Sequence, residues 1–219
     1  MSDYRHILFT GVLLFAFAAI GTSMVAVTYE QSREQIERNE RQVLRRQLNQ
    51  VISPERYDNN LLEDRIEISD PGLGAGRPVT VYRAYMQETP VAAVFTSVAP
   101  DGYNGSIRLL VGIDVNGIVT GVRVLSHRET PGLGDAIEAG RSDWIEGFAG
   151  RSLGDPPVQR WRVRRDGGVF DQFTGATITP RAVVNAIRKT LLYFDEHQEE
   201  ILARPAPDGA QADEETHDE

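Results

Sequence analysis

The sequence predicts an α+β protein in which an N-terminal transmembrane helix and a helical stalk precede one domain with a mainly antiparallel β-sheet flanked by helices. Three observations predict this class: an uncharged apolar run near the N-terminus, alternating β-rich segments separated by turn residues, and an amphipathic helix pattern near the end. The 219 residues leave room for one domain of ordinary size beside the helical extension.

Residues 7–27 contain no charged side chain and, at about 1.5 Å per residue, are long enough to cross a hydrocarbon core of roughly 30 Å. We therefore expect a transmembrane helix after a short flank of residues 1–6. A cleaved signal peptide is the alternative, but this run is longer than the usual apolar region of such peptides. Arginines lie on both sides of the run, and glutamates alternate with those that follow it, so charge alone does not give the orientation.

Residues 28–70 are expected to form a stalk helix and a linker. Apolar residues recur there at helical spacing as far as about Ile52, as an amphipathic helix requires. The pair Ser53-Pro54 should end the helix, because a residue before proline avoids helical angles. A glycine-rich loop then begins at Asp70 and leads into the domain, which we expect to span residues 71–204.

The sequence predicts β-strands in the first half of this domain. Strands are predicted at residues 79–86, 91–98, 107–114 and 118–125, with residues 160–163 and 169–170 as a fifth and a sixth. Turns are expected at Asp101-Gly102 and at Asn116-Gly117. Because the second pair separates two alternating runs, the flanking strands should be antiparallel neighbours. A short helix is expected at residues 143–149, with Trp144 and Phe148 packed in the core.

The closing helix is predicted to begin with Thr179 as N-cap and Pro180 at the first helical position, and to run to about Leu202. Residues 205–219 have the composition of a disordered acidic tail. They carry six acidic residues and no lysine or arginine, so they account for −6 of the formal net charge of −9.

Composition and charge exclude several functions. Without cysteine the chain can form no thiolate metal site, iron–sulfur cluster or disulfide. Because the tail holds most of the negative charge, the domain is nearly balanced, and no clustered basic surface is evident, so we expect no nucleic-acid partner. The histidines are too scattered to suggest a metal site. Ser126 and His127 are neighbours on a strand and point to opposite faces, so we expect no nucleophile–base pair and no catalytic residue.

The turn before the closing helix is the strongest candidate for a binding site. Residues 171–180 hold three threonines and a glycine next to a helix N-terminus, where free N–H groups and the helix dipole favour a phosphate. A plain capping turn is the alternative. The lysine of a Walker A motif is missing, which excludes that kind of nucleotide site.

Asp171, Thr174, Gly175, Ala176 and Thr177 resemble the flavinylation signature of the covalent FMN-binding family. The resemblance implies that Thr177 carries FMN through a phosphodiester, made from FAD by a separate, magnesium-dependent flavin transferase. Asp171 would be a recognition residue for that transferase or simply a turn former. A glutamine stands at position 172, where the family often has glycine.

Residues 102–114 and 121–135 are similar to the G subunits of the Rnf (Rsx) ion-translocating electron transport complex. In that family Glu129, Thr130, Leu133 and Gly134 lie in the loop that closes over the flavin. The resemblance implies an electron carrier without substrate turnover of its own, in a complex that couples ferredoxin and NAD oxidoreduction to ion translocation. It also implies a single-pass protein of the bacterial inner membrane, with a periplasmic domain that meets the other Rnf subunits and membrane lipid.

Three alternatives stay open. The C subunit of the sodium-pumping quinone reductase shares the Glu-Thr-Pro-Gly-Leu-Gly element of residues 129–134, but should be longer. A membrane-tethered assembly or regulatory module without flavin would use the Thr177 turn only as a helix cap. A flavin-binding regulator of nitrous oxide respiration would normally have cysteine clusters and further membrane spans, which this sequence lacks.

Overall fold

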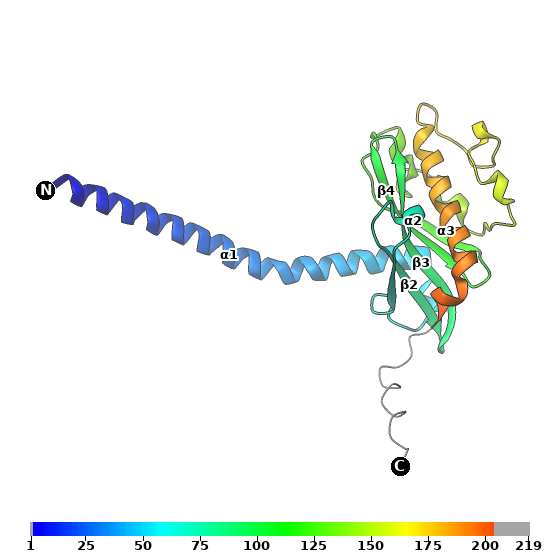
Figure 1. Ribbon diagram of the computed structural model, residues 1–219, viewed down its shortest axis with the longest axis horizontal. Coiled ribbons are helices and arrows are strands. Elements are labelled where there is room, and N and C mark those ends of the chain that lie inside the picture. Colours follow the sequence, from blue (N-terminus) through cyan, green and yellow to red (C-terminus); the bar gives the residue numbers. More distant parts are fainter. Residues whose placement is uncertain (1, 204–219) are drawn as a thin grey trace, which may run out of the picture. The chain divides into compact units, whose positions relative to one another are not determined.

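The computed structural model describes residues 2–203, without the side chains of residues 2–4 and 34 (Figure 1). The acidic tail predicted at 205–219 lies outside the described residues. The chain divides into two compact units, Met1–Arg46 and Gln47–Glu219.

The first unit is formed by the helix α1 (Ser2–Val51), whose last residues belong to the second unit. Within the described part of the chain it is the one helix long and apolar enough to cross a membrane. Its large apolar side chains, from Ile7 to Val27, are exposed. Lipid would remove this surface from water. The boundaries proposed from the sequence for the flank, the span, the stalk and the domain stay predictions.

The second unit is built on a five-stranded antiparallel sheet in the order β1-β2-β3-β4-β5, which confirms the α+β class. The strands are β1 (Arg65–Ile68), β2 (Val79–Met86), β3 (Thr89–Gly102), β4 (Gly105–Asp114) and β5 (Val119–Ser126). The Asn116-Gly117 turn joins β4 to β5, as predicted. Gly117 lies at φ 74°, and its N–H donates to the Asp114 carbonyl.

Two parts of the sheet differ from the prediction. The strand β1 was not predicted because its four residues are alternately exposed and half-buried and include two charged side chains. The turn expected at Asp101-Gly102 is wrong, because β3 continues to Gly102 and pairs it with Gly105. The hairpin tip is therefore formed by Tyr103 and Asn104. The loop after Asp70 contains a short helix, α2 (Pro71–Gly74), which the Asp70 carboxylate caps.

The predicted fifth and sixth strands are also wrong. Short 3-10 helices, η4 (Val158–Arg160) and η5 (Arg164–Asp166), occupy this region, and Val163 and Phe170 form only an isolated bridge. Trp161 and Val163 are buried on either side of an exposed residue, so alternating burial imitates a strand. The short helix expected at 143–149 is also 3-10, η3 (Asp143–Phe148). Its Phe148 is fully buried, and Trp144 packs against the core.

The helix α3 (Ile178–Leu202) packs against the sheet through an apolar face that includes Val183, Ile187 and Leu191. Figure 1 shows it crossing one face of the sheet. Phe194 meets Phe95 of β3 edge to face at 6.2 Å between ring centroids. This packing fixes the start of α3 beside the hairpin tip between β3 and β4.

The helix begins earlier than predicted. Its N-cap is Thr177 rather than Thr179, and Pro180 is the third helical residue rather than the first. A proline is tolerated there because the first N–H groups of a helix have no intrahelical partner. The Thr179 hydroxyl does not cap the helix because a carboxylate of a distant segment accepts its hydrogen bond.

Candidate functional site

A cavity of about 320 Å³ opens at the start of α3. Three segments surround it: the β3–β4 hairpin tip, residues 129–134, and the turn that leads into the helix. Its lining consists of Tyr103, Glu129, Thr130, Leu133, Gly134, Gly175, Ala176, Thr177, Ile178 and Thr179. We call it the Thr177 cavity.

The structure brings together all but one of the predicted cofactor-binding residues, since only Thr174 is absent from the lining. Thr174 is exposed next to the cavity. Asp171, the expected recognition residue, is also exposed. Its carboxylate pairs with Arg164 at 3.1 Å, and its carbonyl accepts the Trp144 indole N–H at 2.8 Å. These contacts hold the turn in place while leaving it at the surface.

Thr177 has a helical backbone (φ −77°, ψ −28°), and its side chain makes no capping hydrogen bond. Among residues 2–203 its hydroxyl has no hydrogen-bond partner. The chain reaches this position through a tight turn in which the Ala176 N–H donates to the Phe173 carbonyl. Gly175 lies at φ 82° in this turn, a conformation that glycine adopts without strain. The turn therefore presents a half-buried, unengaged hydroxyl at a helix N-terminus.

The buried Glu129 side chain links the three segments by hydrogen bonds. Its side chain is only 4% exposed, and it accepts hydrogen bonds from the Thr179 hydroxyl and from the Asn104 N–H. The Glu129 N–H in turn donates to His127 Nδ1 at 3.0 Å. Because Nδ1 accepts, the proton of a neutral ring is on Nε2, which lies 2.6 Å from a Glu138 oxygen. His127 thus positions the loop through its contacts with Glu129 and Glu138.

Leu133 and Gly134 line the cavity, and Gly134 lies close to the start of α3. The N–H groups of both residues donate to the Thr130 carbonyl, which folds the segment into a turn. A Cβ atom at Gly134 would lie 2.9 Å from Glu129 Cβ and 3.0 Å from Thr179 Oγ1, so only glycine fits this approach. The turn directs Leu133 outward, where its side chain is 44% exposed.

The lining fits a flavin mononucleotide. Tyr103, Leu133 and Ile178 are large, exposed side chains around one opening, which suits a planar aromatic ring. The first turn of α3 has N–H groups without intrahelical partners, which suits a phosphate. Tyr103 and Ile178 were not predicted as site residues, although both lie inside stretches that the sequence analysis singled out, residues 102–114 and 171–180. Within the described residues no group of three His, Asp or Glu side chains could hold a metal ion.

Comparison with known proteins agrees with this geometry. Residues 102–192 match the family model of the FMN-binding domain, and residues 1–51 match that of the RnfG N-terminal region. The chain is similar to the G subunit of the ion-translocating oxidoreductase complex of Vibrio cholerae, with 47% identity over 90% of this chain and 94% of the relative. Relatives of the same name have comparable similarity. The one in Shewanella loihica is 47% identical over 92% of this chain and 96% of the relative, and the one in Pseudomonas aeruginosa is 45% identical over 91% of this chain and 94% of the relative. The predicted resemblance is confirmed.

Proposed function

The chain belongs to the family of G subunits of ion-translocating oxidoreductase complexes, and on that premise we propose that it carries electrons in such a complex through an FMN esterified to Thr177. The observation that carries this proposal is the Thr177 hydroxyl, which is unengaged by the described residues and faces a cavity suited to a flavin. As a subunit of an oxidoreductase of the translocase class, the chain needs no substrate turnover of its own.

The attachment is a transfer from FAD by a separate flavin transferase. Thr177 Oγ forms a bond to the phosphorus of the FMN half, the pyrophosphate P–O bond breaks, and AMP leaves while the hydroxyl proton is released. No redox change accompanies this step. The exposed Asp171 and Thr174 support the proposal, because a second enzyme must reach the turn from outside.

The chain's own residues hold and shield the cofactor. The N-terminus of α3 favours the phosphate charge, and Gly175 lets the backbone approach it. Leu133, Ile178 and Tyr103 offer apolar surface to the ring. Glu129 fixes the loop and the helix start through Thr179, so the lining stays in place during electron transfer. FMN, when bound, supplies the redox chemistry, because it can accept and release electrons singly or in pairs.

The same proposal includes the location. Residues 7–27 would cross the bacterial inner membrane once and contact lipid, and the domain would lie in the periplasm beside the other subunits. The exposed apolar stretch of α1 supports the anchor, and the relatives' names support membership in a complex. A covalent bond suits this location, because a cofactor lost outside the cytoplasm could not be recaptured.

The flavin-free alternative makes a different prediction for Thr177. It requires the residue to act as a helix cap, and removal of a cap typically costs about 1 kcal/mol. Thr177 is the N-cap, but its side chain makes no capping hydrogen bond. This observation favours the flavin carrier.

The test compares Thr177→Val with Thr177→Ser in the full chain, exported in a bacterial host that contains a flavin transferase. After denaturing electrophoresis, the wild type and the serine variant should fluoresce as flavoproteins, and the valine variant should not. The melting temperature of the valine variant without flavin should match that of unmodified wild type, because no capping bond is lost. Flavin fluorescence in the valine variant, or none in exported wild type with an active transferase, would overturn the proposal.

A further inference from the structure

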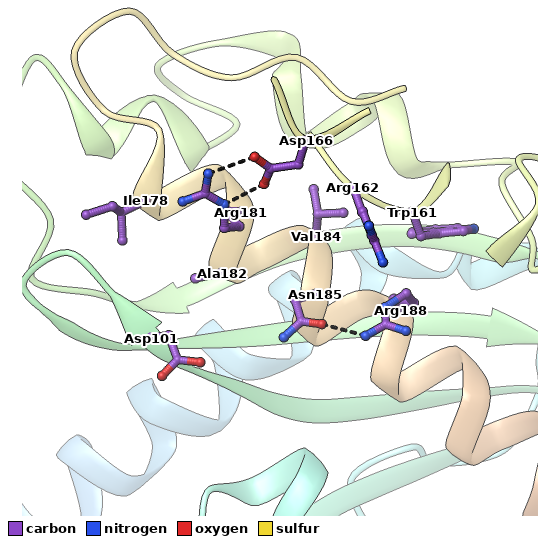
Figure 2. A pocket seen from close by; sticks show the side chains of 10 residues that line it. All are labelled: Asp101, Trp161, Arg162, Asp166, Ile178, Arg181, Ala182, Val184, Asn185 and Arg188. Carbon is purple, nitrogen blue, oxygen red and sulfur yellow. Dashed lines mark hydrogen bonds and ion pairs between the residues drawn. The ribbon is translucent and has the colours of Figure 1, made fainter. Parts of the chain in front are cut away.

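A second cavity, of about 530 Å³, lies on the other side of Ile178, which lines both cavities. Figure 2 shows it between α3 and the segment that carries η4 and η5, with Asp101 and Trp161 on opposite sides of the view. Three arginines from two segments surround it: Arg162, Arg181 and Arg188. We call it the arginine cavity.

One of these arginines is neutralised within the protein. Arg181 donates two hydrogen bonds to Asp166, at 2.6 and 2.9 Å, which are drawn in Figure 2. These bonds hold the pKa of the Asp166 carboxyl below its usual value, so the carboxylate is ionised at neutral pH. The negative charge of Asp166 is therefore engaged by Arg181.

The other two arginines keep their charge available. Arg188 donates to the amide oxygen of Asn185 at 2.8 Å, a neutral partner. Across the described part of the chain, no carboxylate forms an ion pair with Arg162 or Arg188. Both side chains line the cavity and are labelled in Figure 2. Asp101 and Asp166 also line the cavity, and the Asp166 carboxylate feels the charge of Arg162, but neither carboxylate forms an ion pair with Arg162 or Arg188. The cavity thus offers two guanidinium groups that are not ion-paired within the described residues.

The floor beneath the arginines is apolar and firmly held. Trp161 and Val184 are each 1% exposed. Trp161 packs against Phe148 and Phe170, and its indole N–H donates to the Ser152 carbonyl. Arginine and aromatic side chains around buried apolar residues are enriched at the centres of protein interfaces.

We propose that the arginine cavity docks an acidic segment of the protein that exchanges electrons with the flavin on Thr177. This proposal rests on the proposed function. Electron transfer weakens steeply with distance, so the partner must bind next to the Thr177 cavity, and the arginine cavity adjoins it through Ile178. Arginine forks bind carboxylates in bidentate geometry, and their charge guides the approach of an acidic partner.

Two further arginines lie next to lining residues of the cavity in the sequence. Arg160 and Arg165, on either side of Trp161, are exposed on η4 and η5. A small anion would fill only the cavity, whereas a partner surface would use these outer arginines as well. We therefore commit to an acidic protein segment as the occupant.

The first experiment identifies this occupant. Arg162→Lys and Arg188→Lys introduce amines that a carbodiimide joins directly to a carboxylate in contact. Membranes containing the whole complex are treated with this reagent, and the cross-linked peptides are identified by mass spectrometry. The proposal expects a link to Asp or Glu of another subunit, and none from Arg77→Lys, an exposed position outside the cavity. A link to this chain's own residues 205–219, or no link to any protein, would overturn it.

The second experiment measures the consequence for electron transfer. In the whole complex, the double variant Arg162→Glu/Arg188→Glu should slow reduction of the Thr177 flavin by about tenfold at low ionic strength, and the difference should shrink as salt is added. The control Arg65→Glu/Arg77→Glu changes the net charge equally at exposed positions outside the cavity. An unchanged rate in the first variant contradicts the docking proposal. FMN content, read by mass in every variant, tests the proposed function separately, because docking variants should keep their flavin.

Discussion

The two cavities beside Ile178 are neighbours with opposite chemistry. The Thr177 cavity offers hydroxyls, glycines and exposed apolar side chains, and its one carboxylate, Glu129, is buried and hydrogen-bonded. The arginine cavity offers guanidinium groups above an apolar floor. Under the two proposals made above, one cavity retains the cofactor and the other recognises a partner. Because they share only Ile178 among their lining residues, variants can affect one without the other.

The strongest test of this separation removes the floor of the arginine cavity. Trp161→Ala should lower the free energy of unfolding by about 3–5 kcal/mol, because a fully buried aromatic ring is replaced by a void. Urea denaturation measures this, with Trp161→Phe as the milder control. Molecules that still fold should carry FMN on Thr177, since Trp161 does not line that cavity. A loss below about 1 kcal/mol would mean that the floor is not part of the core.

A smaller effect is expected within the Thr177 cavity. Thr179→Val should lower the free energy of unfolding by about 1–3 kcal/mol, because a buried oxygen of Glu129 loses its hydroxyl donor. Thr179→Ser keeps a hydroxyl and should recover most of this loss. Equal stability of the two variants in urea denaturation would contradict the role given to this bond. Neither variant changes the arginine cavity, which Thr179 does not line.

The smallest effect concerns the exposed pair of Asp166 and Arg181. The pKa of Asp166 is lowered in the folded state, chiefly by the Arg181 hydrogen bonds, so the pair stabilises the fold above the carboxyl's ordinary pKa of about 3.9. That stability is lost as the pH falls through the lowered pKa. Urea midpoints of wild type and Asp166→Asn should therefore differ at neutral pH, begin to converge as the pH falls below about 4, and meet below the lowered pKa. A difference that persists unchanged in acid would assign the effect to something other than the ionised pair.

The two cavities also differ in how far sequence could predict them. Most residues that line the Thr177 cavity could be named from the sequence, because they lie in two short motifs, at 129–134 and 171–180. Their role in holding FMN stays a prediction. Tyr103 was missed because the hairpin tip follows Gly102 instead of including it. Thr179 was wrongly assigned as N-cap because its actual partner, Glu129, is 50 residues away in the sequence.

The arginine cavity could not be predicted in the same way. Arg162 lies in a segment whose alternating burial resembles a strand, and Arg188 lies on α3, outside every motif that the sequence analysis singled out. The nearly balanced charge of the domain also concealed the cluster. Only the packing of the η4–η5 segment against α3 brings these arginines to one place.

The central claim is that FMN is covalently attached to Thr177, and intact mass tests it most directly. The full chain is produced with an active flavin transferase, exported and denatured, and the whole protein and the peptide that contains Thr177 are weighed. We predict an added mass of one FMN less one water, which survives denaturation and is confined to that peptide. An unmodified mass, or the same addition on a different residue, would contradict the account.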